Sequence, residues 1–166
     1  GAGVSPTRQQ ISQGALDGVL GYHVVRAQLT TRQIFFRTVG EPLDLRPVEY
    51  SLLMLLHANP PLTPKQLAQA LALSSPNLTI LLDKMQLRGV IERVRSPTDK
   101  RSQHILLSEA GRQLTTRALE LTPGMDEALK PALSAAERAM LMELLKKVAA
   151  CRPDLPASAT PAARLD

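Results

Sequence analysis

Between Thr63 and Leu107 the chain gathers the side chains best suited to bind a charged partner. This segment holds seven Lys or Arg residues against three Asp or Glu, in a chain of 166 residues whose net charge is +5. A local excess of positive charge is typical of a surface that meets a polyanion, and an ordinary solvated surface is the alternative that charge alone leaves open. Side chains of these types can form hydrogen bonds and can neutralise the negative charge of a partner.

Other side chains give no comparable pattern for catalysis or metal binding. The three His residues and the single Cys, Cys151, lack the spacing of a zinc site. The sequence contains no Gly-rich phosphate loop, and nothing in it indicates a Ser-His-Asp site. We therefore expect no catalytic residue, no metal and no cofactor. We also expect no redox role for Cys151, because no group is indicated that would stabilise its thiolate.

Two short helices, joined by a tight break near Ser74, are predicted to position the polar residues. The first begins at Thr63-Pro64-Lys65-Gln66, which has the pattern of a capping box with Pro at the first helical position. The second begins with the hydroxyl cap Ser75, followed by Pro76. Its apolar residues form one stripe that we expect to be buried: Leu78, Leu81, Leu82 and Met85. The opposite face carries Asn77, Ile80 and Lys84, with Thr79 and Asp83 beside them.

A hairpin with a basic tip is predicted to follow the second helix. Gly89 is well placed as the left-handed residue that ends the helix. Residues 90–95 and 103–107 interleave apolar and polar side chains as strands do, and the segment between them is rich in turn-forming residues. The tip places Arg95, Lys100 and Arg101 beside the helix pair. Helix, break, helix and hairpin in this order are typical of a winged helix-turn-helix, whose second helix enters the major groove of DNA.

Longer helices are predicted on both sides of this segment. They cover residues 16–38, ended by Gly40-Glu41-Pro42; residues 47–57; a helix capped by Ser108 and interrupted at Pro123-Gly124; and residues 134–150. Aromatic residues make up 2% of the chain, so the core has to consist of Leu, Val, Ile, Ala and Met. No apolar run reaches the ~18 residues that span a bilayer, and a lone Cys fits a reducing compartment. We therefore expect a cytoplasmic protein with no membrane partner.

Residues 45 to about 121 resemble the MarR family of winged helix-turn-helix transcription regulators. Residues 73–107, LSSPNLTILLDKMQLRGVIERVRSPTDKRSQHILL, and the SEAGRQL after them carry the resemblance. The matching features are Leu-Asp-Lys-Met, the Gly-Val-Ile-Glu-Arg turn, Asp-x-Arg at Asp99 and Arg101, and Leu-Ser-Glu-x-Gly after the wing. The resemblance implies a mainly α fold with a small β-hairpin wing, and N- and C-terminal dimerisation helices.

The domain organisation that we expect follows from this resemblance. Residues 1–14 are predicted to be a flexible tail and 152–166 a disordered tail. Residues 15–151 form a single domain, in which 15–45 and 109–151 are dimerisation helices and 46–108 form the winged helix-turn-helix. Two recognition helices about one DNA turn apart would then read a pseudo-palindromic operator.

The resemblance also implies a set of DNA-binding residues. Ser75, Pro76, Asn77 and Thr79 lie at the start of the recognition helix, and Lys84 and Arg88 meet the DNA backbone further along it. Arg93 points at phosphates, and Asp99 pairs with Arg101, which enters the minor groove. Four further residues complete the set: Thr63, Lys65, Arg95 and Lys100. Ile80 stands where many relatives have a polar or basic side chain. An apolar side chain cannot hydrogen-bond a base, so the base contact available to Ile80 is with the methyl group of thymine.

Family members bind small anionic or phenolic compounds in a crevice between the dimer helices and the DNA-binding lobe. The residues that we expect to line it are Tyr22, His23, Arg26, Arg46, Tyr50 and His57. A core, surface or ion-pair role is the alternative for each of them taken singly. The resemblance thus implies a homodimeric transcription regulator that is not an enzyme, a repressor released by an aromatic or phenolic acid. An activator, a ligand-independent architectural DNA-binding protein, and an enzyme or carrier that uses the crevice are the alternatives.

Overall fold

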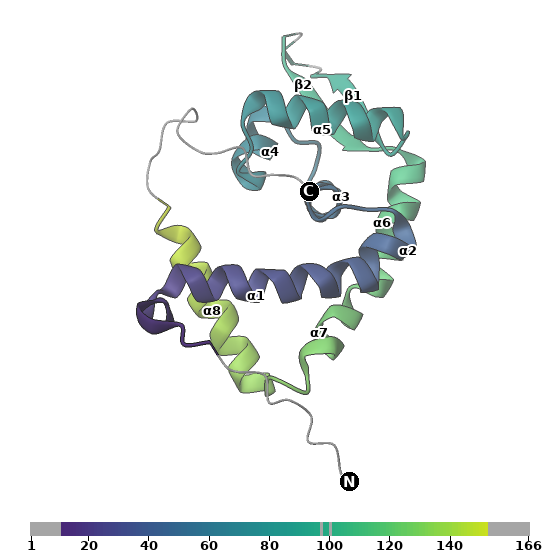
Figure 1. Ribbon diagram of the computed structural model, residues 1–166. Helices are drawn as coiled ribbons and strands as arrows, with labels where there is room; N and C mark the ends of the chain where they lie inside the picture. Colours follow the sequence, from purple (N-terminus) through teal and green to yellow (C-terminus); the bar gives the residue numbers. More distant parts are fainter. Residues whose placement is uncertain (1–10, 97, 100, 153–166) are drawn as a thin grey trace.

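The computed structural model describes residues 11–96, 98–99 and 101–152. The chain is mainly helical with one two-stranded antiparallel sheet (Figure 1). In order, the elements are the 3₁₀ turn η1 (Gly14–Gly18), α1 (Leu20–Phe35), the π turn η2 (Phe36–Gly40), α2 (Glu41–Leu43), α3 (Pro47–Ala58), α4 (Pro64–Leu71), α5 (Ser75–Leu87), β1 (Ile91–Arg95), β2 (Gln103–Leu107), α6 (Glu109–Leu121), α7 (Pro123–Leu129) and α8 (Ala135–Ala150). Most of residues 1–14 and nearly all of 152–166, the two predicted tails, lie outside the described residues, as does Lys100.

The N-terminal helix differs from the prediction at both ends. It begins at Leu20 and not at Leu16, because Val19 has an extended backbone after the 3₁₀ turn η1. We expected Gly40-Glu41-Pro42 to end it, but the helical backbone continues through η2 and α2 and ends at Asp44, whose φ of 51° is left-handed. Pro42 lies in α2, directly after the π turn η2, and the backbone before it is helical. The helix therefore reaches the junction with α3 without a break.

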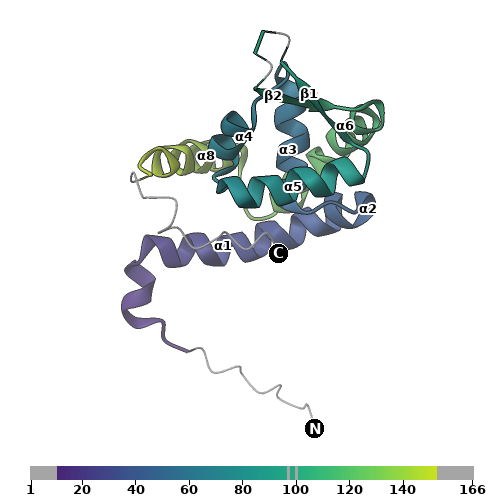
Figure 2. The same ribbon diagram turned by 90° about the horizontal axis from the view of Figure 1, so that it is seen from above.

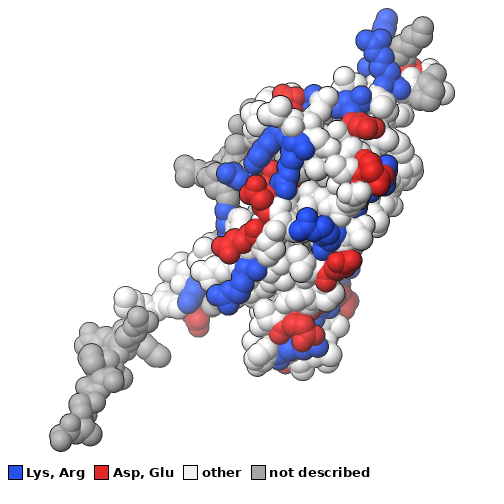
Figure 3. All heavy atoms as spheres, turned by 90° about the vertical axis from the view of Figure 1, so that its right-hand side faces the viewer, with Lys and Arg blue, Asp and Glu red and all other residues white. Residues whose placement is uncertain are grey.

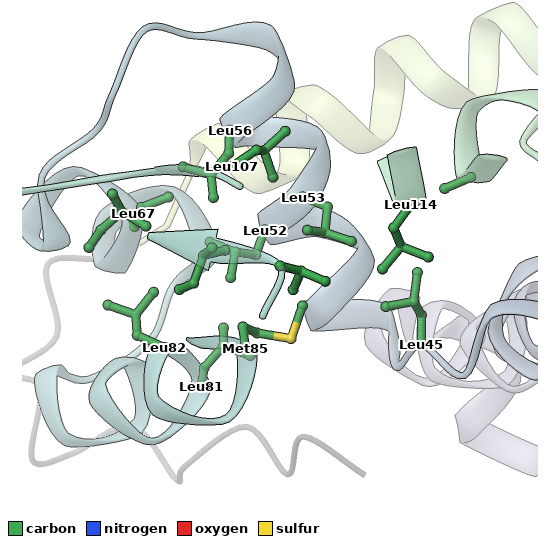
Figure 4. Packing of buried hydrophobic residues seen from close by; sticks show 14 of the residues in the cluster. Leu45, Leu52, Leu53, Leu56, Leu67, Leu81, Leu82, Met85, Leu107 and Leu114 are labelled. Carbon is green, nitrogen blue, oxygen red and sulfur yellow. The ribbon is translucent and has the colours of Figure 1, made fainter. Parts of the chain in front are cut away.

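The core lies between α3, α5, the hairpin and α6. Leu52 and Leu53 of α3 are fully buried, and Figure 4 shows them facing Leu81, Leu82 and Met85 of α5. The predicted stripe of α5 is thus confirmed as buried. Leu114 of α6 lies beside Leu45 at the other end of the cluster. We refer to α3–α6 with the hairpin as the head.

A close approach of α6 fixes the exit of α5. The Ser108 hydroxyl donates to the Gly89 carbonyl at 2.6 Å, and the Ser108 N–H donates to the Val90 carbonyl at 3.1 Å. A Cβ on Gly111 would lie 1.9 Å from that Val90 carbonyl oxygen, so only glycine permits this contact. Gly89 itself has a φ of +82°, as the sequence predicted for the end of the helix.

The outer helices have a different environment. In α8 every residue except the half-buried Arg138 is exposed, and in α1 only Phe35 is buried. Figures 1 and 2 show α8 away from the core of the head, and the first half of α1 projecting beyond it. Large apolar side chains are nevertheless exposed on these segments: Leu16, Val19, Leu20, Val24, Val25, Leu29, Met140, Leu141, Met142, Leu144, Leu145 and Val148. We refer to η1, α1 and α8 as the arms. No described helix is long and apolar enough to cross a membrane.

Candidate nucleic-acid interface

The amino end of α5 presents short polar side chains to solvent. The structure places the N-cap at Ser74, one residue before the predicted Ser75, because it is the Ser74 hydroxyl that accepts the Asn77 N–H at 3.3 Å. Ser75, Pro76 and Thr79 are exposed and Asn77 is half-buried. The Thr79 hydroxyl donates to the Ser75 carbonyl at 3.0 Å, so it offers its lone pairs to a partner. Ile80 is 63% exposed on the same helix.

The helix before it braces α5 and contributes less to the surface. Thr63 caps α4 in the predicted capping box, since its hydroxyl accepts the Gln66 N–H at 3.2 Å and its own N–H donates to Gln66 Oε1 at 2.9 Å. Thr63 is half-buried, whereas Lys65 is exposed. Ala72 in the left-handed conformation then reverses the chain into α5.

The wing is a regular hairpin fixed to the head at its base. β1 and β2 pair from Ile91↔Leu107 to Arg95↔Gln103. Leu62, just before α4, forms a bridge to Ile105 with hydrogen bonds of 3.1 and 2.7 Å, which join the wing to the start of the helix pair. Arg95 and Arg101 are exposed near the tip.

The tip differs in detail from the predicted pairing of Asp99 with the Arg101 side chain. Asp99 Oδ1 accepts the backbone N–H of Arg101 at 3.0 Å, and the Asp99 carbonyl accepts the Ser102 N–H at 3.1 Å. Asp99 therefore holds the turn through main-chain groups and leaves the Arg101 side chain exposed.

Three predicted DNA-binding cations make contacts inside the chain. Arg93 Nη2 lies 2.8 Å from Asp83 Oδ1, which joins β1 to α5. Lys84 Nζ lies 3.0 Å from Glu49 Oε2 of α3. The Arg88 guanidinium donates to the carbonyls of Leu43, at 2.7 Å, and Asp44. Sequence analysis missed Glu49 and Asp83 as partners, because each contact joins elements whose packing only the folded chain reveals.

The surface charge is uneven. Figure 3 shows Lys and Arg side chains on the projection at the top, which is the wing of Figure 1, and basic and acidic side chains alternating over the rest of that face. The wing is therefore the most clearly basic feature of that view. Among the described residues, no group of three or more His, Cys, Asp or Glu could hold a metal ion.

The six residues predicted to bind an effector fall into two groups within one chain. Tyr22, His23 and Arg26 lie on the first half of α1, where the Arg26 guanidinium is 5.7 Å from the Tyr22 ring centroid. Tyr50 instead packs against Phe35 near the end of α1, with ring centroids 5.4 Å apart, and its hydroxyl is 2.7 Å from Thr122 Oγ1. At 1.5 Å per residue, Tyr22 lies about 20 Å along the helix from Phe35. Arg46 and His57 lie at the two ends of α3, and both are exposed.

Comparison with known proteins connects this geometry to a family. A family model described as MarR family matches residues 43–102, from the end of α2 to the wing. The multiple antibiotic resistance protein MarR of Escherichia coli (strain K12) is 32% identical to this chain over 109 residues, which cover 64% of this chain and 75% of that protein.

Two solved structures of the transcriptional repressor CouR are also similar to the chain. CouR bound to a 23-mer DNA duplex superposes with a TM-score of 0.79 and 33% identity, covering 84% of this chain and 99% of that one. CouR bound to p-coumaroyl-CoA gives a TM-score of 0.77 and 31% identity, covering 86% of this chain and 100% of that one. These likenesses confirm the winged helix-turn-helix fold with its flanking helices.

Proposed function

The chain belongs to the MarR family of transcription regulators, and from this premise we propose that it binds an operator as a homodimer, with α5 in the major groove and the wing against the backbone and the neighbouring minor groove. It is a transcription regulator rather than an enzyme. The observation that carries the proposal is the exposed polar amino end of α5 together with exposed Arg95 and Arg101 on a wing that the Leu62–Ile105 bridge joins to the start of α4. A recognition helix has to be held in this way to present its first turn to base edges.

The proposed contacts divide by chemistry. Asn77 and Thr79 are suited to base edges, and Ser75 and Pro76, at the helix amino end, to a phosphate. The cations proposed to neutralise the backbone or to enter the minor groove are Lys65, Arg93, Arg95, Lys100 and Arg101. Thr63 and Asp99 contribute by holding α4 and the wing tip.

A second copy of the chain is the proposed occupant of the apolar side chains exposed on the arms. Val24 of α1 and Leu145 of α8 belong to this set, and they are too numerous for an isolated chain to leave in water without cost. CouR, which matches 84% of this chain, is bound to a 23-mer DNA duplex in one of its structures. In the proposed dimer residues 15–45 and 109–151 associate, and 46–108 meet DNA.

The proposed regulation is repression relieved by a small aromatic acid or its coenzyme A thioester. The support is chemical: the candidate residues combine guanidinium groups with aromatic rings, and these groups suit an aromatic carboxylate. The ligand of CouR, p-coumaroyl-CoA, belongs to this class. The six effector residues predicted above remain the candidate set. A regulator of this kind acts where the chromosome is, so the cytoplasm remains the predicted location.

The test begins with selection of an operator from a random duplex library by the purified protein. Fluorescence anisotropy at matched salt then compares that operator with random duplex. We expect at least a thousandfold preference. Equal affinity for both duplexes would favour an architectural protein, and the absence of binding to any duplex at low salt would overturn the proposal. Release of the operator by p-coumarate or p-coumaroyl-CoA tests the effector class separately.

Arg101→Ala tests the wing in the same assay. If Arg101 neutralises a phosphate or enters the minor groove, its loss lowers affinity and reduces the slope of log K against log salt by about 0.9. Arg152, exposed after the end of α8 and outside the proposed DNA and dimer contacts, provides the matched control Arg152→Ala, which should leave the slope unchanged. A slope that stays the same in Arg101→Ala would show that the wing does not meet the duplex.

A further inference from the structure

Two cations of the recognition helix are directed at the junction between the N-terminal helix and α3. Lys84 and Arg88 are four residues apart, so they lie on one face of α5. That face meets the junction of residues 43–49, where α2 ends and α3 begins, and Figure 2 shows the carboxyl end of α5 beside α2. The contacts span more than thirty residues of sequence. Arg88 joins the helix proposed to read DNA to the end of the N-terminal helical run, and Lys84 joins it to the first turn of α3.

Arg88 supplies hydrogen bonds that the end of a helix otherwise lacks. The last carbonyls of an α-helix have no partner within the helix. The carbonyls of Leu43 and Asp44 are such groups, and both accept hydrogen bonds from the Arg88 guanidinium. The planar fork of an Arg side chain suits two adjacent acceptors, which the single ammonium of Lys cannot satisfy in the same geometry. Arg88 thus caps the N-terminal helix from another element.

Lys84 makes the second contact, one turn earlier on α5. Its ammonium lies 3.0 Å from Oε2 of Glu49, whose side chain is 3% exposed. Oε1 of the same carboxylate accepts the Arg46 N–H at 2.8 Å and completes the capping box at the start of α3. Since Glu49 is fixed by both its burial and this hydrogen bond, Lys84 is attached to a rigid point.

From this geometry we propose that Lys84 and Arg88 are positioning residues that fix the orientation of α5 relative to the junction of residues 43–49, between the N-terminal helix and α3, and do not act through contacts with DNA phosphates. In a dimer joined through its arms, the contacts of Lys84 and Arg88 with the junction set the separation of the two recognition helices. A movement of the end of α2 is carried to α5, because the Arg88 guanidinium is hydrogen-bonded to the main-chain carbonyls of Leu43 and Asp44. The proposal rests on the proposed function, and wild-type binding to the selected operator is the separate test of that function.

Glu49→Gln separates the two roles, because they predict opposite signs. Gln keeps the acceptor for the Arg46 N–H, as Gln66 does in the capping box of α4. If Lys84 contacted phosphate, removal of the competing carboxylate would free its ammonium, strengthen operator binding and steepen the salt slope. If Lys84 positions α5, operator binding weakens, by about tenfold, and the slope does not change. Circular dichroism and thermal melting establish that the variant is folded.

Arg88→Lys tests the second contact without changing net charge. A positioning role predicts at least tenfold weaker operator binding with an unchanged salt slope, because one ammonium cannot cap both carbonyls. It also predicts a smaller penalty than in wild type when one base pair is inserted between the half-sites, since the two heads are no longer held at one separation. Arg152→Lys, the same change at an exposed position outside the proposed DNA and dimer contacts, is the control and should match wild type.

Each outcome decides the question. Operator binding by Arg88→Lys equal to that of wild type, or tighter binding by Glu49→Gln, would overturn the positioning role. A slope that falls by about 0.9 in Arg88→Met would assign Arg88 to a phosphate contact instead. If the wild-type protein bound no duplex, the proposed function would fail and this proposal with it. Weaker binding with unchanged slopes and a relaxed spacing preference in both variants would establish it.

Discussion

The head and the arms of this chain both carry large apolar side chains, which are buried in the head and exposed in the arms. In the head, Leu52, Leu53 and Met85 are completely buried, and the hairpin and α6 close around them. In the arms, Leu144, Leu145 and Val148 of α8 are between 43% and 49% exposed. An apolar stripe stabilises a fold only when something covers it. The head covers its own stripes, whereas the arms need a surface from outside the chain, which is the physical reason for proposing a second copy.

The largest effect should come from deleting a core side chain of the head. Leu52→Ala should lower the free energy of unfolding by about 2–5 kcal/mol, the range for a fully buried Leu, because the cavity cannot refill. Chemical denaturation at several protein concentrations checks this. The same truncation in the arm, Leu145→Ala, is the matched variant, and its effect should depend on protein concentration. Concentration-independent losses of equal size in both variants would erase the distinction between the two regions.

A charge in the arm should act on assembly rather than on the fold of the head. Leu145→Glu should weaken self-association by at least about tenfold, or ~1.4 kcal/mol, because a carboxylate would have to be buried at the interface. Sedimentation velocity measures the shift. Ala139→Glu introduces the same charge on α8 outside the apolar stripe and should leave association nearly unchanged. Equal behaviour of the two variants would argue that α8 does not lie in the interface.

Removal of a helix cap gives a smaller effect in both regions. Ser74 caps α5 and Ser134 caps α8 through the same hydroxyl contact, at 3.3 and 3.1 Å. Ser74→Ala should cost about 1 kcal/mol of unfolding free energy at any protein concentration. Ser134→Ala should change stability only where the chain is dimeric, since α8 has little contact with its own head. Thermal melting over a range of protein concentrations distinguishes the two.

The smallest expected effect is a difference in acid sensitivity between two capping boxes. Hydrogen bonds from Ser134 hold the pKa of the exposed Glu137 carboxyl below its usual value. A lowered pKa in the folded state means that the stabilisation is complete above the unfolded pKa and is lost as the pH falls through the folded one. The protection factor of the Ser134 amide, which compares its exchange rate with the intrinsic rate at the same pH, should therefore fall on acidification. The box of α4 uses Gln66, which does not titrate, so the Thr63 amide should show no such change.

Local signals in the sequence were sufficient for most of the head. The buried stripe of α5, the capping box at Thr63 and the left-handed Gly89 follow from spacing and backbone preference, and the structure confirms each of them. The interruption at Pro123-Gly124 is confirmed as well, because α6 ends at Leu121 and α7 begins at Pro123. These features depend on contacts within a few residues, which a sequence displays directly.

What the sequence could not show depends on contacts between distant segments. Ser74 and Ser75 are both competent caps, and only the fold selects Ser74. The end of the N-terminal helix was placed too early because Gly40, a typical helix terminator, is buried in a π turn against Phe36 and Leu45. Arg88 looked like a free cation on a recognition helix, although it is held by carbonyls that are 44 and 45 residues away. The DNA-binding and effector residues stay predictions.

The stoichiometry of the complex with DNA tests the central claim most directly. In sedimentation equilibrium with the selected operator duplex, the wild-type chain should bind as two copies per duplex, and at micromolar concentration the free protein should already be dimeric. A single copy bound with full affinity and sequence preference would show that the head reads DNA alone. The apolar side chains exposed on the arms would then need another explanation, and the difference in burial between head and arms would not indicate a dimer.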